Sequence, residues 1–139
     1  MRLTRAGEYA VRCVLYLSRR GRGALVSRKE VAREADIPGQ FLAKIVQQLA
    51  RHGIIEIMQG ASGGYRLLLE PGQITMLEVI ETIIGEISLN DCVVRPDSCG
   101  NSGICAVHQV WSQAQEQLRD YLHGVTFSDL LVEEKRLLR

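Results

Sequence analysis

The order of helix and turn signals in the first half of the chain limits its fold more than any other feature. Apolar residues recur at helical spacing from Ala6 to Leu17, which predicts a first helix that ends in the loop at 21–24. Ser27 and Glu30 have the spacing of a capping box, in which the serine accepts a backbone N–H and the glutamate reaches back to the cap. This pattern predicts that a short second helix begins here.

A third helix and a β-hairpin are expected next. Proline disfavours helix in the residue before it but fits the first turn of a helix, so the turn at 36–39 predicts a third helix from about Pro38. Two β-prone runs, at 54–58 and 65–69, flank the glycine-rich segment 59–64 and predict a hairpin. Three helices followed by a hairpin is the order of a winged helix-turn-helix, whose third helix enters the major groove of DNA.

The second half of the chain predicts another helix, a loop and a long C-terminal helix. Thr75 and Glu78 again have capping-box spacing and begin a helix that is expected to stop at Gly85. We therefore expect a mainly α-helical protein in three parts. These are a winged helix-turn-helix DNA-binding domain at 1–85, a cysteine loop without stable periodicity at 86–104, and a dimerisation helix with a short final helix at 105–139.

Apolar residues in the long C-terminal helix are spaced alternately by four and three positions, which is the pattern of a coiled-coil seam. The seam residues are Val107, Trp111, Ala114, Leu118 and Tyr121. A seam of two heptads could also be a face that packs against the core of the same chain. Because DNA-binding modules of this type work as symmetric dimers on paired half-sites, we expect the seam to hold a homodimer on a pseudo-palindromic operator.

The charges of the chain are unevenly distributed. Residues 1–70 hold 12 Lys and Arg against 6 Asp and Glu, whereas residues 71–139 hold 5 against 10. A basic first half suggests a polyanion such as double-stranded DNA as its partner, although uneven charge can also be an ordinary solvated surface.

Three groups of residues are candidates for contacts with DNA. Glutamine and lysine can bond base edges, arginine and lysine can neutralise phosphates, and glycine lets the backbone approach closely. Each residue alone is an ordinary surface residue, but the turn, the wing and the charge coincide. The candidates are Gln40, Lys44, Gln47, Gln48 and Arg51 on the third helix, Gln59, Ser62, Gly63 and Gly64 in the wing, and Arg2, Arg5, Arg28, Lys29 and Arg66 as phosphate contacts.

Three of the four cysteines form a metal-like pattern. Cys92, Cys99 and Cys105 are spaced C-x6-C-x5-C, and His108 follows as C-x2-H. In a reducing compartment, clustered cysteines indicate metal ligands or redox groups. The spacing suits an iron–sulfur cluster better than the close cysteine pairs of structural zinc, while a zinc site, a disulfide switch and plain reduced thiols stay open. Cys13 lies on the apolar face of the first helix and is expected in the core.

Several segments together resemble the small winged-helix regulators of the Rrf-two family, which includes IscR, NsrR, RirA and CymR. The segments are LTRAGEYAVR at 3–12, the wing GASGGY at 60–65, SLNDC at 88–92, the three-cysteine loop, and VTFSDL at 125–130. The resemblance covers essentially the whole chain. Members with this loop hold a 2Fe-2S or 4Fe-4S cluster, so the resemblance implies one iron–sulfur cluster per subunit that reports cluster status, iron, redox state or nitric oxide.

The resemblance leaves two candidates for the fourth cluster ligand. In the IscR pattern a histidine three residues after the last cysteine completes the site, and His108 matches it. In the NsrR pattern a carboxylate on the first helix of the other subunit does so, and Glu8 lies at that place. A third pattern needs a histidine where this chain has Arg12, so we prefer His108, with Glu8 as the alternative. The chain departs from IscR at Ala43 and Gln59, so the resemblance does not determine its operator sequence.

The remaining features concern location and enzyme function. The longest apolar run near the start is 13–17, too short for a secretory or membrane segment, so we expect a cytoplasmic protein without membrane contact. No catalytic triad or phosphate-binding loop stands out, which argues against an enzyme. We therefore expect a DNA-binding transcription regulator, a repressor that senses an iron–sulfur cluster. The rival hypothesis is a cluster-free thiol-switch regulator or a protein-interaction module.

Overall fold

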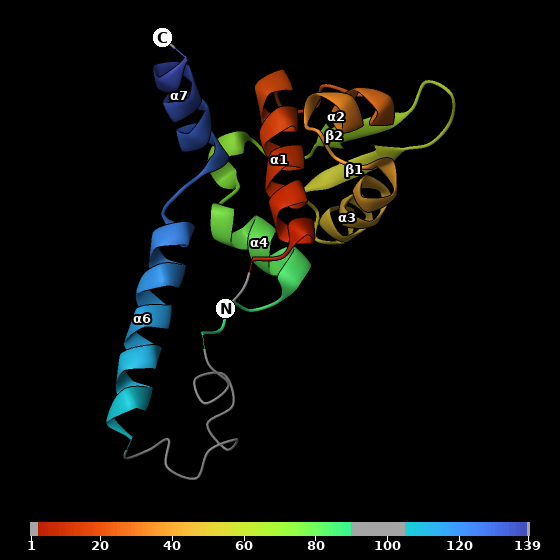
Figure 1. Ribbon diagram of the computed structural model, residues 1–139. Coiled ribbons are helices and arrows are strands. Elements are labelled where there is room, and N and C mark those ends of the chain that lie inside the picture. The colour runs from red at the N-terminus through yellow and green to blue at the C-terminus, as the bar shows by residue number, and fades with distance from the viewer. Residues whose placement is uncertain (1–2, 90–104, 139) are drawn as a thin grey trace.

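The computed structural model describes residues 3–89 and 105–138, and Figure 1 shows helices with a two-stranded hairpin at one side. This architecture confirms the expected mainly helical winged helix-turn-helix with further helices at the C-terminus. Within the described residues, no helix combines the length and the apolar character needed to span a bilayer. The elements are α1 (Arg5–Arg20), α2 (Arg28–Glu34), α3 (Gly39–Arg51), β1 (Ile55–Met58), β2 (Gly64–Leu67), η1 (Pro71–Gln73), α4 (Met76–Ile84), α6 (Ala106–His123) and α7 (Phe127–Leu137).

α1 packs against several of the other helices. Its apolar face contacts α3, α4 and α7. Cys13 on this face is fully buried, as expected, and burial raises the pKa of its thiol to about 12. Leu42 and Leu49 of α3 are fully buried in the same core. Burying side chains of this size contributes about 1.5–3 kcal/mol each, which holds the opposite face of α3 toward solvent.

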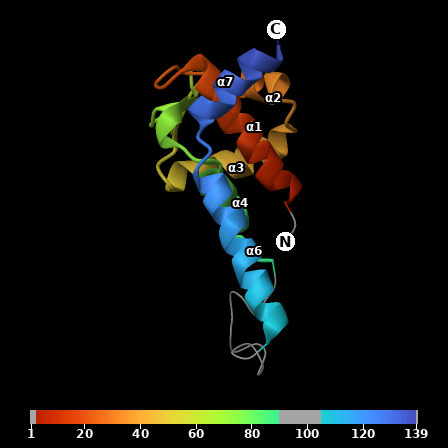
Figure 2. The same ribbon diagram turned by 90° about the vertical axis from the view of Figure 1, so that its left-hand side faces the viewer.

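The C-terminal helices are attached through α4. Met76 N donates to Val125 O at 2.9 Å and Phe127 N donates to Ile74 O at 3.0 Å, which joins the starts of α4 and α7. The C-terminal half of α6 lies beside α4, whereas its N-terminal half extends away from the other helices (Figure 1, Figure 2). The start of α6, where Cys105 and His108 were predicted to be ligands, therefore lies away from the other described helices.

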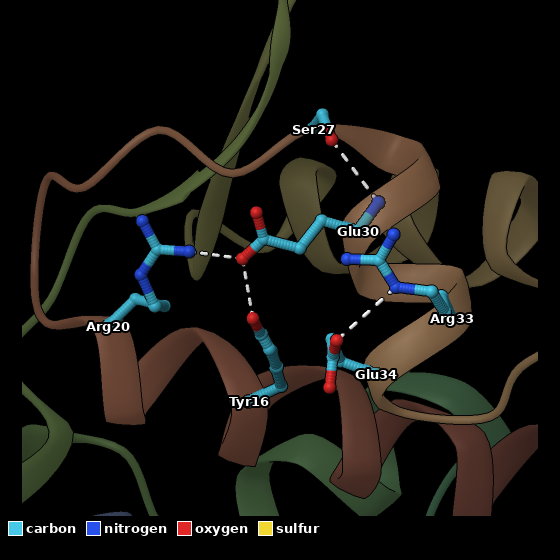
Figure 3. Close-up of polar contacts among 6 residues, drawn as sticks. All are labelled: Tyr16, Arg20, Ser27, Glu30, Arg33 and Glu34. Atoms are coloured by element: carbon cyan, nitrogen blue, oxygen red, sulfur yellow. Dashed lines mark hydrogen bonds and ion pairs between the residues drawn. The ribbon is translucent and has the colours of Figure 1, made fainter.

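The start of α2 follows the sequence signal only in part. Ser27 Oγ accepts a hydrogen bond from Glu30 N at 3.2 Å, which confirms the N-cap. The reciprocal half of the expected capping box is wrong, because the Glu30 carboxylate turns to α1 and accepts hydrogen bonds from Tyr16 and Arg20 (Figure 3). A charge-assisted bond to arginine is stronger than a bond to a neutral backbone N–H. Glu30 therefore ties α2 to α1 instead of closing its own cap.

The hairpin is the wing expected around 59–64. β1 and β2 pair antiparallel in a register that sets Met58 opposite Gly64. The two glycines beside the tip have a packing reason within the chain, since a Cβ on Gly63 would overlap the carbonyl oxygen of Met58 and a Cβ on Gly64 would overlap that of Val26. The wing thus requires both glycines for its own fold, whatever it contacts.

Candidate functional site

α3 presents a polar face to solvent. Gln40, Lys44, Gln47 and Arg51 are exposed, while the apolar stripe of the helix is buried beneath them. Gln48 is half-buried and is the least accessible of the residues that were predicted on this helix. The side chains that can reach a partner without rearrangement are therefore the four exposed ones.

The turn before α3 is attached to α1 by Arg12 and Tyr9, which were not predicted to contribute to a DNA-binding site. Arg12 Nη1 donates to the carbonyl oxygen of Asp36 at 3.3 Å, and the guanidinium lies 5.5 Å from the ring centroid of Tyr9. The Tyr9 ring lies 5.5 Å from that of Phe41 in the first turn of α3. Helical spacing could have placed Tyr9 and Arg12 on one face of α1, but their partners lie beyond any local pattern. Together these contacts set where α3 begins.

A groove of about 540 Å³ lies between the first turn of α2, α3 and the hairpin. Its walls bring together predicted residues from three separate elements. These are Arg28 and Lys29 of α2, Gln47 of α3, and Gln59, Gly63 and Gly64 of the wing. Arg28 and Lys29 are exposed at this groove, so a basic rim lies beside the exposed Gln47 of α3.

The other predicted DNA contacts differ in accessibility. Arg5 is exposed at the start of α1 and Ser62 is exposed at the tip of the hairpin. Arg66 is half-buried, and its Nη2 and Nε donate to Glu56 Oε2 at 2.8 and 2.9 Å. Its positive charge is therefore partly balanced by a carboxylate on the neighbouring strand. Arg2 lies outside the described residues.

The candidate cluster ligands are only partly within the described residues. Cys105 is half-exposed at the N-cap of α6, and His108 follows one turn later on the same helix. Glu8, the alternative ligand, is exposed in the first turn of α1. Within 3–89 and 105–138, the side chains of His, Cys, Asp and Glu do not form a group of three suited to a metal ion. Outside the described residues lie Cys92 and Cys99.

The structure divides the expected seam of α6 between two environments. Val107, Trp111 and Tyr121 are 56%, 39% and 71% exposed. Ala114 is half-buried, and Leu118 packs against a small apolar cluster formed with α4 of the same chain. Four of the five predicted seam residues thus lie outside this intrachain cluster, and one lies within it.

Comparison with known proteins agrees with this geometry. An HTH-type transcriptional regulator of Aquifex aeolicus is 33% identical over 133 residues, which are 94% of this chain and 92% of that protein. T. potens IscR shares the fold with a TM-score of 0.80 at 20% identity, over 100% of this chain and 92% of that chain. CymR of B. subtilis shares it with a TM-score of 0.78 at 23% identity, over 94% of this chain and 95% of that chain.

A family model gives the most specific result. The model named Rrf2, described as an iron-dependent transcriptional regulator, matches residues 3–133. The match covers α3, the hairpin and α6 completely, and α7 up to residue 133. Transcriptional regulation by DNA binding, and not catalysis, is the activity of this family. The chain therefore belongs to the Rrf2 family of DNA-binding transcriptional regulators.

Proposed function

We propose that this protein is a homodimeric, cytoplasmic repressor that senses an iron–sulfur cluster and binds a pseudo-palindromic operator. The observation that carries the proposal is the position of Cys105 and His108 at the start of α6. The same helix carries the exposed apolar residues Val107, Trp111 and Tyr121. Candidate ligands and the candidate subunit contact share one element. A change at the ligands would therefore reach the subunit contact directly, and with it the separation of the two α3 helices.

Each subunit would read one half-site through α3. Lys44 and Gln47 are exposed at the centre of the polar face and have the chemistry to bond base edges. Arg28 and Lys29, on the rim of the groove beside the wing, would neutralise phosphates on the flanking backbone. A symmetric dimer would then place its two α3 helices in successive major grooves, about 34 Å apart.

The chemistry of the donor set fits an iron–sulfur cluster. Cys105 occupies the N-cap of α6 without a capping hydrogen bond from its sulfur to this helix, which leaves a half-exposed thiol available to iron. His108 Nε2 lies 3.4 Å from Ser112 Oγ, a contact of the kind that orients a ligating imidazole. When bound, the cluster would supply a centre that responds to oxidants, nitric oxide or loss of iron. The remaining ligands would be Cys92 and Cys99, with Glu8 as the alternative to His108.

The proposed division of labour follows the chain, with DNA binding in 1–85, the cluster loop in 86–104 and dimerisation in 105–139. In the chain, the helices and hairpin proposed to bind DNA precede α6, whose exposed apolar residues would form the subunit contact. Contacts cross the boundary between the first and last parts, since Phe127 is fully buried in the core that α1 and α3 form and Leu118 packs against α4.

Anaerobic purification tests the cluster directly. The protein is expected to be brown, with visible absorption and with iron and sulfide matching about one cluster per subunit. Cys99→Ala should remove the colour, whereas Cys13→Ala should keep it, because Cys13 is buried in the core. A colourless protein that holds zinc, or an iron-free protein that forms a reversible disulfide, would contradict cluster sensing.

A DNA titration tests the regulatory part. The probe is a duplex enriched from a random-sequence library by the wild-type protein. The cluster-loaded and metal-free forms are expected to differ in affinity for it by about five- to 150-fold, the usual range of coupling between two sites. Equal affinity of the two forms for every enriched duplex would end the sensing proposal while leaving DNA binding intact.

A further inference from the structure

Glu81 on α4 joins three parts of the chain. Its carboxylate accepts hydrogen bonds from Arg119 on α6, at 3.1 Å to Oε2 and 2.9 Å to Oε1, and one from Ile87 N at 2.7 Å. The Glu81 side chain is 19% exposed. Burial opposes ionisation of this carboxyl, but the bonds from Arg119 and the Ile87 N–H outweigh it and hold the pKa of Glu81 below its ordinary value.

The segment that follows α4 is held by side chains of neighbouring helices. Gly85 turns the chain with a φ of +83°. Ile87 N donates to Glu81, and Leu89 N donates at 3.1 Å to Oε1 of Gln115, a residue of α6 that is 7% exposed. The Ile87 side chain is buried in the small apolar cluster between α4 and α6. The side chains of Glu81 and Gln115 are therefore the acceptors for the backbone N–H groups of Ile87 and Leu89.

The hydrogen bonds that Glu81 accepts from Arg119 and the Ile87 N–H fix the relative position of α4 and α6 more than they stabilise the fold. A bidentate arginine–carboxylate pair sets the distance and orientation of two helices, and an apolar pair of the same volume would hold α4 and α6 together at least as strongly. Removing the Glu81 carboxylate would leave both Arg119 and the Ile87 N–H without this acceptor. The arrangement therefore makes the position of the segment and the position of α6 depend on one another.

We propose that Glu81 is a positioning residue that couples segment 86–89 to the DNA-binding unit through α4. The inference rests on the proposed function, since the candidate ligand Cys92 follows Leu89 by three positions. α4 packs against α1, and α1 holds the turn before α3 through Arg12. A shift of segment 86–89 would therefore change the position of α4 between α6 and α1. Through α1 it would also change the position of α3.

Amide hydrogen exchange tests the positioning role in metal-free protein. Glu81→Gln is expected to speed exchange at Ile87 by about tenfold, because a neutral acceptor replaces a charged one. Glu133→Gln, which removes the same charge from an exposed ion pair on α7, is the matched control. Gln115→Leu should speed exchange at Leu89 and is the second variant if Glu81→Gln does not fold. Unchanged exchange at both amides would overturn the positioning role.

DNA titration with the enriched duplex tests the coupling. In Glu81→Gln the affinity ratio between cluster-loaded and metal-free protein is expected to fall at least about fivefold, and in Glu133→Gln it should stay as in wild type. An unchanged ratio in Glu81→Gln overturns the coupling. A wild-type protein without iron overturns the proposed function and the coupling with it, and exchange at Ile87 then still decides whether Glu81 positions the segment.

Discussion

Asp36 adopts a left-handed backbone, with a φ of +54°, between α2 and α3. Short polar side chains tolerate this region better than other non-glycine residues do, because they can hydrogen-bond locally. The carbonyl oxygen of the same residue accepts the hydrogen bond from Arg12. The left-handed backbone of Asp36 and the hydrogen bond from Arg12 thus help to set where α3 begins.

Asp36→Val is expected to lower the free energy of unfolding by about 1–2 kcal/mol, because a β-branched residue is strained at positive φ. Asp36→Asn is the control and should change it by less than about 0.5 kcal/mol. Urea unfolding followed by circular dichroism measures both. Equal stability of the two variants would show that the left-handed conformation does not limit this turn.

Lys44→Ala is expected to weaken binding to the enriched duplex by about 1–3 kcal/mol, as loss of a base contact does, and to lower the slope of log affinity against log salt, because it removes one positive charge from the interface. Lys135→Ala removes the same charge from an exposed site on α7 and serves as the control. Fluorescence anisotropy at several salt concentrations gives both quantities. Unaltered affinity at moderate salt would count against placing α3 in the groove.

The lowered pKa of Glu81 predicts a contribution to stability that acid removes. The folded carboxyl takes up its proton at lower pH than the unfolded one, so the contribution is complete above the ordinary pKa of 4.5 and is lost as pH falls through the folded value. The stability difference between wild type and Glu81→Gln should therefore shrink from about pH 6 to about pH 3. Urea titrations at each pH measure it, and a constant difference would contradict the prediction.

At the scale of elements, the apolar residues of α6 lie on one side of the helix but differ in burial. Leu118 and Leu122 pack against α4 of the same chain, and Gln115, one turn before Leu118, is buried. On the same side of the helix, an apolar stripe formed by Val107, Val110, Trp111 and Tyr121 stays exposed. Packing inside the chain and contact with a second subunit, which the heptad spacing left as alternatives, are therefore compatible on one helix.

Trp111→Glu is expected to dissociate the proposed homodimer, because it places an unpaired charge within an apolar contact. Gln113→Glu adds the same charge two residues further along α6, at an exposed position outside the stripe, and should leave the dimer intact. Sedimentation velocity distinguishes the two forms. A stable dimer of Trp111→Glu would show that this face of α6 does not join the subunits.

At the scale of the whole molecule, the end of the chain returns to the unit formed by its beginning. Phe127 opens α7 and is fully buried in the main core, together with Val14 and Leu17 of α1. Glu134 of α7 pairs with Arg19 at the end of α1. The segment assigned to dimerisation therefore also completes the DNA-binding unit, so α6 is attached to that unit at both the α4 and the α7 side.

Phe127→Ala is expected to lower the free energy of unfolding by about 3–5 kcal/mol, through lost burial and the cavity it leaves. Val132→Ala on the same helix is the control, since Val132 is 69% exposed, and should change it by less than about 0.5 kcal/mol. Thermal and urea unfolding measure both variants. A loss below about 1 kcal/mol for Phe127→Ala would show that α7 is separable from the core.

Local sequence signals were sufficient for most of the fold and for the outward face of α3. Caps, glycine and proline turns and helical spacing act within a few residues, so α1, α2, α3, the hairpin and α4 were predicted close to their observed positions, whereas η1 was not predicted. The same periodicity that buries Leu42 and Leu49 necessarily exposes Lys44 and Gln47. The cluster ligands stay a prediction, because two of the cysteines lie outside the described residues.

By itself, the sequence determined which segments form helices and strands, which face of each is apolar, and that the chain carries a recognition helix and a wing. Only the tertiary structure decided the partners of the charged side chains: Glu30 with Arg20, Glu81 with Arg119, and Arg12 with the Asp36 carbonyl. The physical reason is the separation along the chain over which each kind of interaction acts. Burial patterns are set by backbone periodicity over neighbouring residues, whereas a flexible charged side chain binds whichever group the packed helices bring near it, as Arg19 binds Glu134, 115 positions away.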